Sequence, residues 1–205
     1  MQDLVLLVAD KNAQFALSGA LCRPEALGIR KIEFTFLVHP GRDGGARKSG
    51  PEMLNLETRR FQHAILLFDL EGSGAELLDA RLLEQQLDTQ LAATWQGRAK
   101  TVVIEPEVDI WLWGSDNAMQ QVLGWTDKIP IRPWLQEKGF EFTIEGKPTR
   151  PKEAFQEVVR KCGLPRSSSL YAKITGKLSL QRCTDSAYQR LAAKLREWFP
   201  ISERA

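Results

Sequence analysis

Four short apolar segments, separated by polar and helix-forming stretches, dominate the pattern of the first 105 residues. Leu4–Ala9 and Ala64–Phe68 are continuous apolar runs, which are typical of strands buried on both faces of a parallel sheet. Lys31–Val38 alternates and is rich in aromatic and β-branched residues, and Thr101–Ile104 is again mainly apolar. The pattern therefore predicts four strands.

The segments between these strands predict helices and one loop. Apolar residues recur at helical spacing after Asn12, which can cap a helix, and a long helix is predicted over residues 75–93. The glycine-rich stretch His39–Gly50 predicts a loop, and Pro51 suits the first turn of a short helix after it. Strands that alternate with helices favour a parallel sheet wrapped by helices, as in Rossmann-like folds.

Beyond Trp113 the pattern is less regular and mostly helical. A β-hairpin is predicted at residues 140–144. Three later helices are predicted to begin at Pro151, at Ser167 and at Thr184 or Asp185, the last of them ending near Phe199. We therefore expect an α/β core over residues 1–115, and a mostly helical, basic extension packed on that core over residues 116–205.

The composition is that of a globular chain. Its 205 residues are 43% hydrophobic and 26% charged, and no apolar run approaches the ~20 residues that cross a bilayer. Cys22, Cys162 and Cys183 have no zinc-ligand spacing, so we expect reduced and mostly buried thiols. The N-terminal segment has an acid where a signal peptide has basic residues, which favours a cytoplasmic protein with no membrane partner.

Charge is distributed unevenly, although the net charge is only +2. Residues 147–205 contain 13 Lys and Arg against 5 Asp and Glu, whereas residues 1–146 contain 15 against 21. A basic segment indicates an anionic partner such as DNA or RNA, or alternatively a solvated helical face or an acidic protein partner. The candidate nucleic-acid contacts are Arg42, Lys152, Arg166, Lys173, Lys177, Arg182 and Arg190.

Ionisable residues follow each of the four predicted strands. They are Asp10 and Lys11, then His39, Arg42 and Asp43, then Asp69 and Glu71, and finally Glu105, Glu107 and Asp109. If the strands are parallel, these side chains converge on one edge of the sheet, where such folds bind ligands. Crowded carboxylates without a Cys or His cluster suit Mg²⁺ or Mn²⁺, and such ions favour phosphoryl or phosphodiester chemistry. The alternative is that these residues are ordinary polar side chains at strand and helix ends.

The segments VLLVADKN, AILLFDLEGSG and VIEPEVDIWLW, in this order, resemble the Toprim domain of bacterial defence proteins. The similarity extends to OLD-like nucleases and to small Toprim-like proteins, and KLSLQRCTDSAYQRLAAKLREW is similar to the C-terminal segment of the latter. It implies that Asp10, Asp69, Glu71 and Asp109 hold Mg²⁺, that Glu107 assists, and that Lys11 stabilises charge on the scissile phosphate. The chain departs from the family at Asp10, where Glu is usual, and at Glu71, where a DxD motif has Asp.

This resemblance implies a metal-dependent nuclease of anti-phage defence that acts with an ATPase or another defence subunit. Because each departure shifts a carboxylate by about one C–C bond, a non-catalytic subunit that binds nucleic acid or protein is the alternative. A phosphoacceptor domain is a third hypothesis, since Asp69 closes a third strand. It lacks support, because such a domain needs paired acids after the first strand and a lysine after a fifth.

Three other residues allow two interpretations each. His39 suits either proton transfer at the site or plain surface polarity. Trp111 and Trp113 are expected to face apart, one in the core and one against the helical extension, with base stacking as the less favoured alternative.

Overall fold

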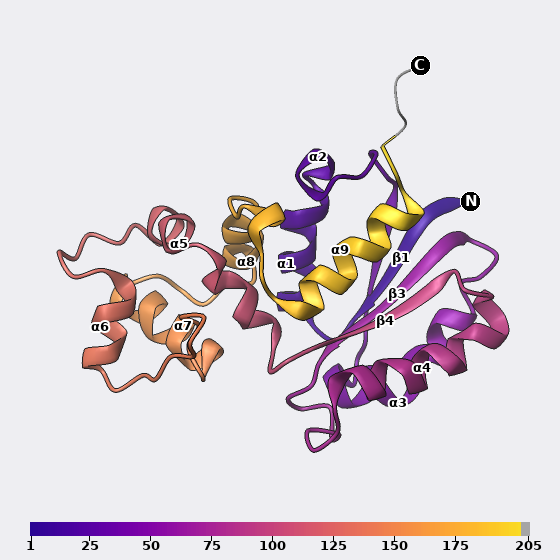
Figure 1. Ribbon diagram of the computed structural model, residues 1–205, viewed down its shortest axis with the longest axis horizontal. Helices are drawn as coiled ribbons and strands as arrows, with labels where there is room; N and C mark the ends of the chain where they lie inside the picture. The colour runs from indigo at the N-terminus through magenta and orange to yellow at the C-terminus, as the bar shows by residue number, and fades with distance from the viewer. Residues whose placement is uncertain (202–205) are drawn as a thin grey trace.

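The computed structural model describes residues 1–201, with the exception of the Arg182 side chain. Its centre is a sheet of four strands, β1 (Gln2–Val8), β2 (Phe34–Val38), β3 (Phe61–Asp69) and β4 (Ala99–Ile104). All neighbouring pairs are parallel and the spatial order is β2-β1-β3-β4 (Figure 1). The predicted fold class, an α/β protein with a parallel sheet flanked by helices, is therefore confirmed.

The strand register brings the carboxyl ends of the strands to one edge. Val8 in β1 pairs with Val38 in β2 and with Leu67 in β3, and Asp69 pairs with Ile104 in β4. The chain moves from β1 outward to β2 and then crosses back to β3 on the other side of β1. The switch point of this topology therefore lies between β1 and β3, which is where open α/β sheets bind ligands.

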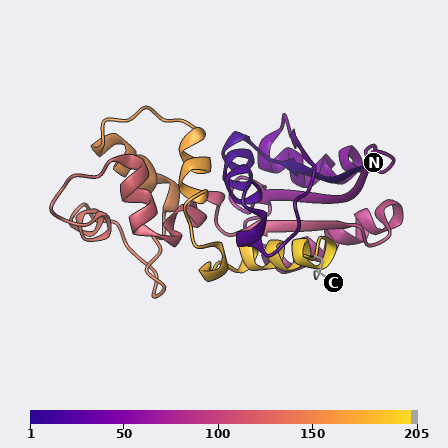
Figure 2. The same cartoon turned by 90° about the horizontal axis from the view of Figure 1, so that it is seen from above.

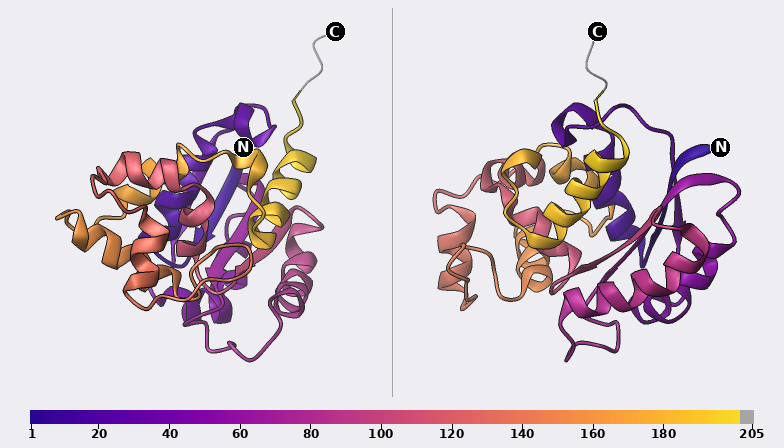
Figure 3. Two further views of the ribbon diagram at one scale, coloured as in Figure 1. Left: turned by 60° about the vertical axis from the view of Figure 1, so that its left-hand side comes forward. Right: turned by 45° about the vertical axis from the view of Figure 1, so that its right-hand side comes forward.

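Helices cover both faces of the sheet, because strand residues alternate between two apolar clusters. Leu4 and Leu6 belong to the cluster that includes α1 (Lys11–Leu21) and α9 (Ser186–Trp198). Val5 and Leu7 belong to the cluster under α3 (Arg42–Asn55) and α4 (Ala80–Trp95). Figure 3 shows α9 on one side of the sheet and α4 on the other.

Helix α9 packs against β4, so the layer that covers the sheet includes residues well beyond 115. It begins after Asp185, whose side chain accepts a hydrogen bond from the Tyr188 backbone N–H, as expected for a cap. The Asp185 side chain also accepts a hydrogen bond of 2.9 Å from the Trp111 indole.

The remaining helices form a lobe beyond the carboxyl ends of the strands (Figure 2). They are α5 (Asp116–Leu123), α6 (Ile131–Glu137) and α7 (Pro151–Lys161). The 3₁₀ helix η1 (Val108–Gly114) joins β4 to this lobe, and α8 (Ser169–Thr175) returns the chain to α1. The short helices α2 (Pro24–Leu27) and η2 (Leu180–Arg182) complete the chain.

Trp111 and Trp113 are both buried, so neither is available to stack on a base. Trp111 packs edge-on against Tyr188 of α9, whereas Trp113 packs against Phe142 and donates to the Pro151 carbonyl. The two rings thus have different partners, but both contact residues of the predicted helical extension, so the expected division between core and extension is not observed. The hairpin predicted at residues 140–144 is reduced to a single antiparallel bridge between Phe142 and Pro148.

The predicted loop at residues 39–50 is wrong, because most of it belongs to α3. The His39 ring lies against the first turn, where a Cβ on Gly45 would be 2.4 Å from it. A Cβ on Gly50 would come within 2.7 Å of Leu66 in the sheet. These glycines therefore permit close packing, and Pro51 lies inside the helix rather than at its start.

Two expectations from composition are also tested. All three cysteines are unpaired, but Cys22 is exposed and the other two are half-buried rather than buried. No helix within residues 1–201 is both long enough and apolar enough to span a bilayer.

Candidate functional site

Asp10 and Asp69 lie on either side of the switch point of the sheet. Asp10 follows β1 directly and caps α1, because its Oδ1 accepts a hydrogen bond of 2.9 Å from the Ala13 N–H. Asp69 is the last residue of β3, and its Oδ1 accepts a hydrogen bond of 2.9 Å from the Val108 N–H. The fold therefore places two carboxylates where a ligand is expected.

Two further aspartates adjoin this pair. Asp43, in the first turn of α3, accepts a hydrogen bond of 2.9 Å from the Asp69 N–H. Asp109, in η1, accepts one of 2.6 Å from the Tyr171 hydroxyl of α8. Helix α8 reaches this position because Gly19 of α1 allows close approach: a Cβ there would lie 2.2 Å from Thr175 Oγ1.

The four aspartates are held in the same way. One oxygen of each carboxylate accepts a hydrogen bond that fixes its orientation, in three cases from a backbone N–H. Within the described chain the other oxygen accepts no recorded hydrogen bond and is not a buried unpartnered atom. One oxygen of each aspartate is thus not engaged by a hydrogen bond within the described chain.

Burial and mutual repulsion perturb three of these carboxylates. Burial, followed by the charges of Asp43, Asp109, Asp10 and Glu107, raises the pKa of Asp69 well above its ordinary value. Burial also raises the pKa of Asp43, and it raises that of Asp109 to about 7 despite the hydrogen bond from Tyr171. Such a cluster is destabilised at neutral pH unless a positive charge lies among its members.

One lysine supplies part of that positive charge. Lys152 of α7 donates from Nζ to Glu107 at 2.9 Å, and its backbone N–H donates to the other oxygen of the same carboxylate. Burial opposes the charged form of Lys152, but the hydrogen bond and charge of Glu107, with the charges of Asp109 and Asp69, raise its pKa. Both oxygens of Glu107 are thereby engaged, which sets it apart from the four aspartates.

An open cleft of about 520 Å³ begins at Asp10 and extends over the ends of β1 and β2. Lys11, Arg42 and Lys152 line it. The cleft therefore combines one acid of the cluster, Asp10, with three cationic side chains, and Lys152 links it to Glu107. This charge pattern is the one expected where a metal cation on the acids and basic side chains beside it together bind an anion.

His39 also lines the cleft but has a structural role. Its Nδ1 accepts from the Gly41 N–H at 3.0 Å, and its Nε2 lies 3.0 Å from the Ser49 hydroxyl. Burial lowers the pKa of the ring. Both nitrogens are thus used to fix the start of α3, and neither is free for proton transfer.

The predicted site residues come together only in part. Asp10, Asp69, Glu107 and Asp109 converge, whereas Glu71 is exposed in the loop after β3 and is close enough to act on Glu107 only through its charge. The sequence also points to Asp43, since this acid follows the second strand, but not to its role as partner of Asp69. Tyr171 carries no local signal, because its distance from Asp109 depends on how α8 packs against α1.

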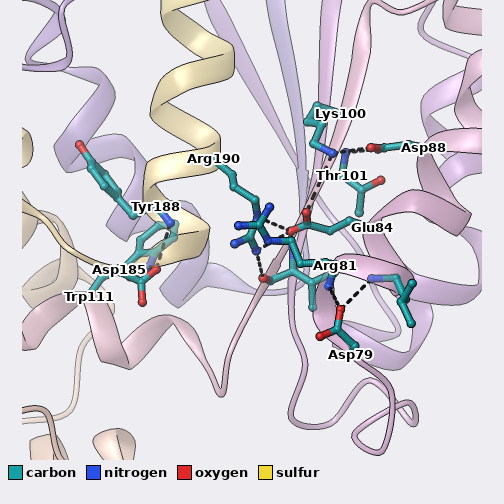
Figure 4. A network of polar contacts seen from close by, with 12 residues as sticks. Asp79, Arg81, Glu84, Asp88, Lys100, Thr101, Trp111, Asp185, Tyr188 and Arg190 are labelled. Carbon is teal, nitrogen blue, oxygen red and sulfur yellow. Dashed lines mark hydrogen bonds and ion pairs between the residues drawn. The ribbon is translucent and has the colours of Figure 1, made fainter. Parts of the chain in front are cut away.

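The basic residues of segment 147–205 are less available to an anionic partner than the charge of the segment indicates, because several of them form ion pairs within the fold. Lys152 pairs with Glu107, Lys147 with Asp185, and Lys161 with Asp127. Arg190, a predicted nucleic-acid contact, is engaged within the fold instead: it donates to Glu84 of α4 at 2.6 Å and to the Val103 carbonyl (Figure 4).

Three of the other predicted nucleic-acid contacts are exposed. Arg166, Lys173 and Lys177 are exposed, and none has a recorded hydrogen-bond or ion-pair partner in the described part of the chain. Arg182 has a side chain that lies outside what the structure describes. The three exposed cations lie on α8 or directly before and after it.

The cluster fits a divalent ion that has few protein ligands. As arranged, no three His, Cys, Asp or Glu side chains of residues 1–201 are placed to hold a metal ion. Mg²⁺, however, keeps several waters and is usually held by one or two carboxylates together with substrate phosphates. Open aspartate oxygens without Cys or His suit this mode, whereas they do not suit a fully enclosed site such as structural zinc.

The raised pKa of Asp109 predicts a specific pH dependence in metal-free buffer with EDTA. The folded state holds a proton on Asp109 up to about pH 7, whereas the unfolded chain releases it near pH 4, so this residue lowers stability as pH rises between these values. Asp109→Asn keeps an acceptor for Tyr171 and removes that effect. We expect the unfolding free energy of Asp109→Asn minus that of the wild type to increase with pH, by at most about 1.4 kcal/mol per unit.

Urea titrations at pH 5, 6, 7 and 8 measure this difference. The charge-neutralising variant Glu52→Gln, at an exposed position of α3, is the matched control and should show no trend. A difference between Asp109→Asn and the wild type that stays constant over this range would contradict the prediction.

In comparisons with family models, with curated proteins and with solved structures, nothing matches this chain.

Proposed function

We propose that this protein is a metal-dependent phosphodiesterase that hydrolyses nucleic acid, a Toprim-like nuclease of bacterial anti-phage defence. The observation that carries the proposal is the group of four anchored aspartates at the switch point of a parallel sheet, three of them with raised pKa values. Such a group is destabilised without a cation. Hard oxygen donors of this kind favour Mg²⁺ or Mn²⁺.

Asp10 and Asp69 are the proposed principal ligands, because each projects from a strand end with one oxygen open. Asp109 is proposed as a further ligand. Glu71 and Glu107 are proposed to act through water, since Glu71 lies in an exposed loop and Lys152 engages both oxygens of Glu107. A bound Mg²⁺ supplies Lewis-acid stabilisation and an activated water. Lys11 at the cleft wall is then placed to bind a phosphate oxygen. Asp43 orients Asp69 by holding its backbone N–H.

The role in defence and the partnership with an ATPase rest on the resemblance of the strand-end motifs to Toprim proteins. The exposed cations Arg166, Lys173 and Lys177 support a nucleic-acid ligand, since they have no acidic partner among the described residues. Neither DNA nor RNA is favoured by these contacts.

A second function is supported by a separate observation. Within the described residues no three acidic side chains are poised to ligate, and the two departures from the Toprim pattern, Asp10 and Glu71, both belong to the proposed ligand set. A non-catalytic subunit that binds nucleic acid or a protein of a defence complex is therefore the alternative.

Metal binding is tested by thermal unfolding with and without 10 mM MgCl₂ or MnCl₂. Because a ligand of the folded state stabilises by mass action, we expect the wild-type Tm to rise by about 2–4 °C per kcal/mol of stabilisation. Asp69→Asn should lose most of this rise, while Glu52→Gln should keep it. A wild type whose Tm is insensitive to both metals would exclude the shared site.

A further inference from the structure

A second, smaller cavity adjoins the acidic cluster. It has a volume of about 170 Å³ and lies between the start of α1, helix α7 and the segment that leads into α8. Asn12 lines both this cavity and the cleft. Tyr171 lines the cavity, and its hydroxyl donates to Asp109. A molecule bound in the cavity therefore lies next to the proposed reaction site.

Part of the cavity wall is apolar. Phe155, Val159, Leu170 and Tyr171 line it, and each of these residues is at most 8% exposed. The rings of Phe155 and Tyr171 pack edge to face, with their centroids 5.4 Å apart. The two rings fix each other, so the cavity is preformed for a flat apolar group.

The mouth of the cavity is polar and has unused hydrogen-bonding groups. The Oδ1 atom of Asn12 accepts a hydrogen bond of 2.7 Å from the Ser168 hydroxyl, which leaves its NH₂ group as a donor. Gln156 and Arg166 also line the mouth. Across the described chain, neither their side chains nor the Asn12 NH₂ group has a recorded hydrogen-bond partner.

We propose that this cavity binds one unpaired nucleobase of a single-stranded nucleic acid, adjacent to the phosphate that lies over the aspartates. A nucleobase combines a flat apolar face with donors and acceptors along its edge, which matches apolar walls beneath two amides and a guanidinium. Arg166 is exposed at the mouth and is suited to the neighbouring phosphate. Because a paired base cannot enter a cavity of this kind, the substrate is single-stranded rather than duplex.

This inference deepens the proposed function and rests on it for the identity of the substrate. Its test is a binding measurement without catalysis. Fluorescently labelled single-stranded 12-mers, as DNA and as RNA, are titrated with protein in EDTA, and one abasic residue is moved through the sequence. We expect one position at which base removal weakens wild-type binding by about tenfold.

The blocking variant is Gln156→Trp, which fills the mouth from a half-buried position of α7. This variant should bind the intact strand about tenfold more weakly than the wild type does, and it should no longer distinguish one abasic strand from another. Gln136→Trp, at an exposed position of α6 outside the cavity, is the matched control and should behave as the wild type.

Three results would overturn the inference: no binding of any single strand, equal binding of all abasic strands, or Gln156→Trp that binds as the wild type does. Because the titration contains no metal, these results are distinct from those of the Tm and cleavage assays. If the Tm of the wild type does not respond to metal but its binding still discriminates abasic strands, the base site stands and the nuclease assignment is rejected.

Discussion

Glu84→Ala is expected to lower the unfolding free energy by about 3–5 kcal/mol, because it leaves a buried guanidinium without its partner. Glu84 is 2% exposed and accepts from Arg190 Nε at 3.0 Å, from Arg190 Nη2 at 2.6 Å and from the Val103 N–H at 2.9 Å. Lys100 completes the group at 3.9 Å (Figure 4). The substitution removes the acceptor for all these donors at once. Urea denaturation followed by circular dichroism measures the loss.

The matched control is Glu197→Ala on the same helix as Arg190. Glu197 forms an exposed pair with Lys194 at 2.6 Å, and such pairs contribute at most about 1 kcal/mol. Glu84→Gln separates charge from shape, since it keeps an acceptor for Val103 but loses the ionic partner of Arg190. If Glu84→Ala and Glu197→Ala lower stability equally, the buried pair does not hold α9 on the sheet.

Asp69→Asn is expected to reduce cleavage of nucleic acid by more than about 100-fold, the upper range for residues that only support a metal ligand. Asn can keep the hydrogen bond from Val108 but loses the charge that attracts the ion. Binding of the strand should be unchanged or tighter, because one carboxylate is removed from the acidic cluster, where it would repel a phosphate. The assay is release of labelled DNA or RNA fragments with Mg²⁺ or Mn²⁺.

Two controls make the cleavage result decisive. Glu52→Gln removes a charge from an exposed position of α3 and should leave cleavage unaffected. The assay is repeated with candidate ATPase partners, because a nuclease that depends on a partner is inert alone. Cleavage that survives Asp69→Asn would remove Asp69 from the catalytic site, and a wild type that is inert in every mixture would favour the non-catalytic alternative.

The sheet could be predicted from the sequence because its strands are buried on both faces. The runs around Leu4–Ala9 and Ala64–Phe68 match β1 and β3 to within a few residues, since no other element of this length needs continuous apolar residues. Helix α3 could not be predicted in the same way. Its glycines at positions 45 and 50 are typical of a loop, yet here they allow contact with His39 and with Leu66.

The candidate site was predictable as far as it depends on strand ends. Asp10 and Asp69 follow apolar runs directly, so a parallel sheet is enough to bring them together. The partners supplied by the lobe depend on tertiary packing instead. Tyr171 reaches Asp109 only through the close approach of α8 to α1 at Gly19. Arg190 of α9 pairs with the buried Glu84 of α4, which lies far earlier in the chain.

The return of α9 to β4 has a consequence for how this chain folds during synthesis. Residues 186–198 cover the face of the sheet that includes Leu4, Leu6 and Val102, and Phe199 accepts a hydrogen bond from the Arg30 N–H beside β1. A nascent chain that has reached residue 115 contains all four strands and α1, but it still exposes the part of this face that α9 covers, at β4. The lobe between β4 and α9 is thus an insertion into a layered unit, and its length can change in evolution without altering the order of the strands.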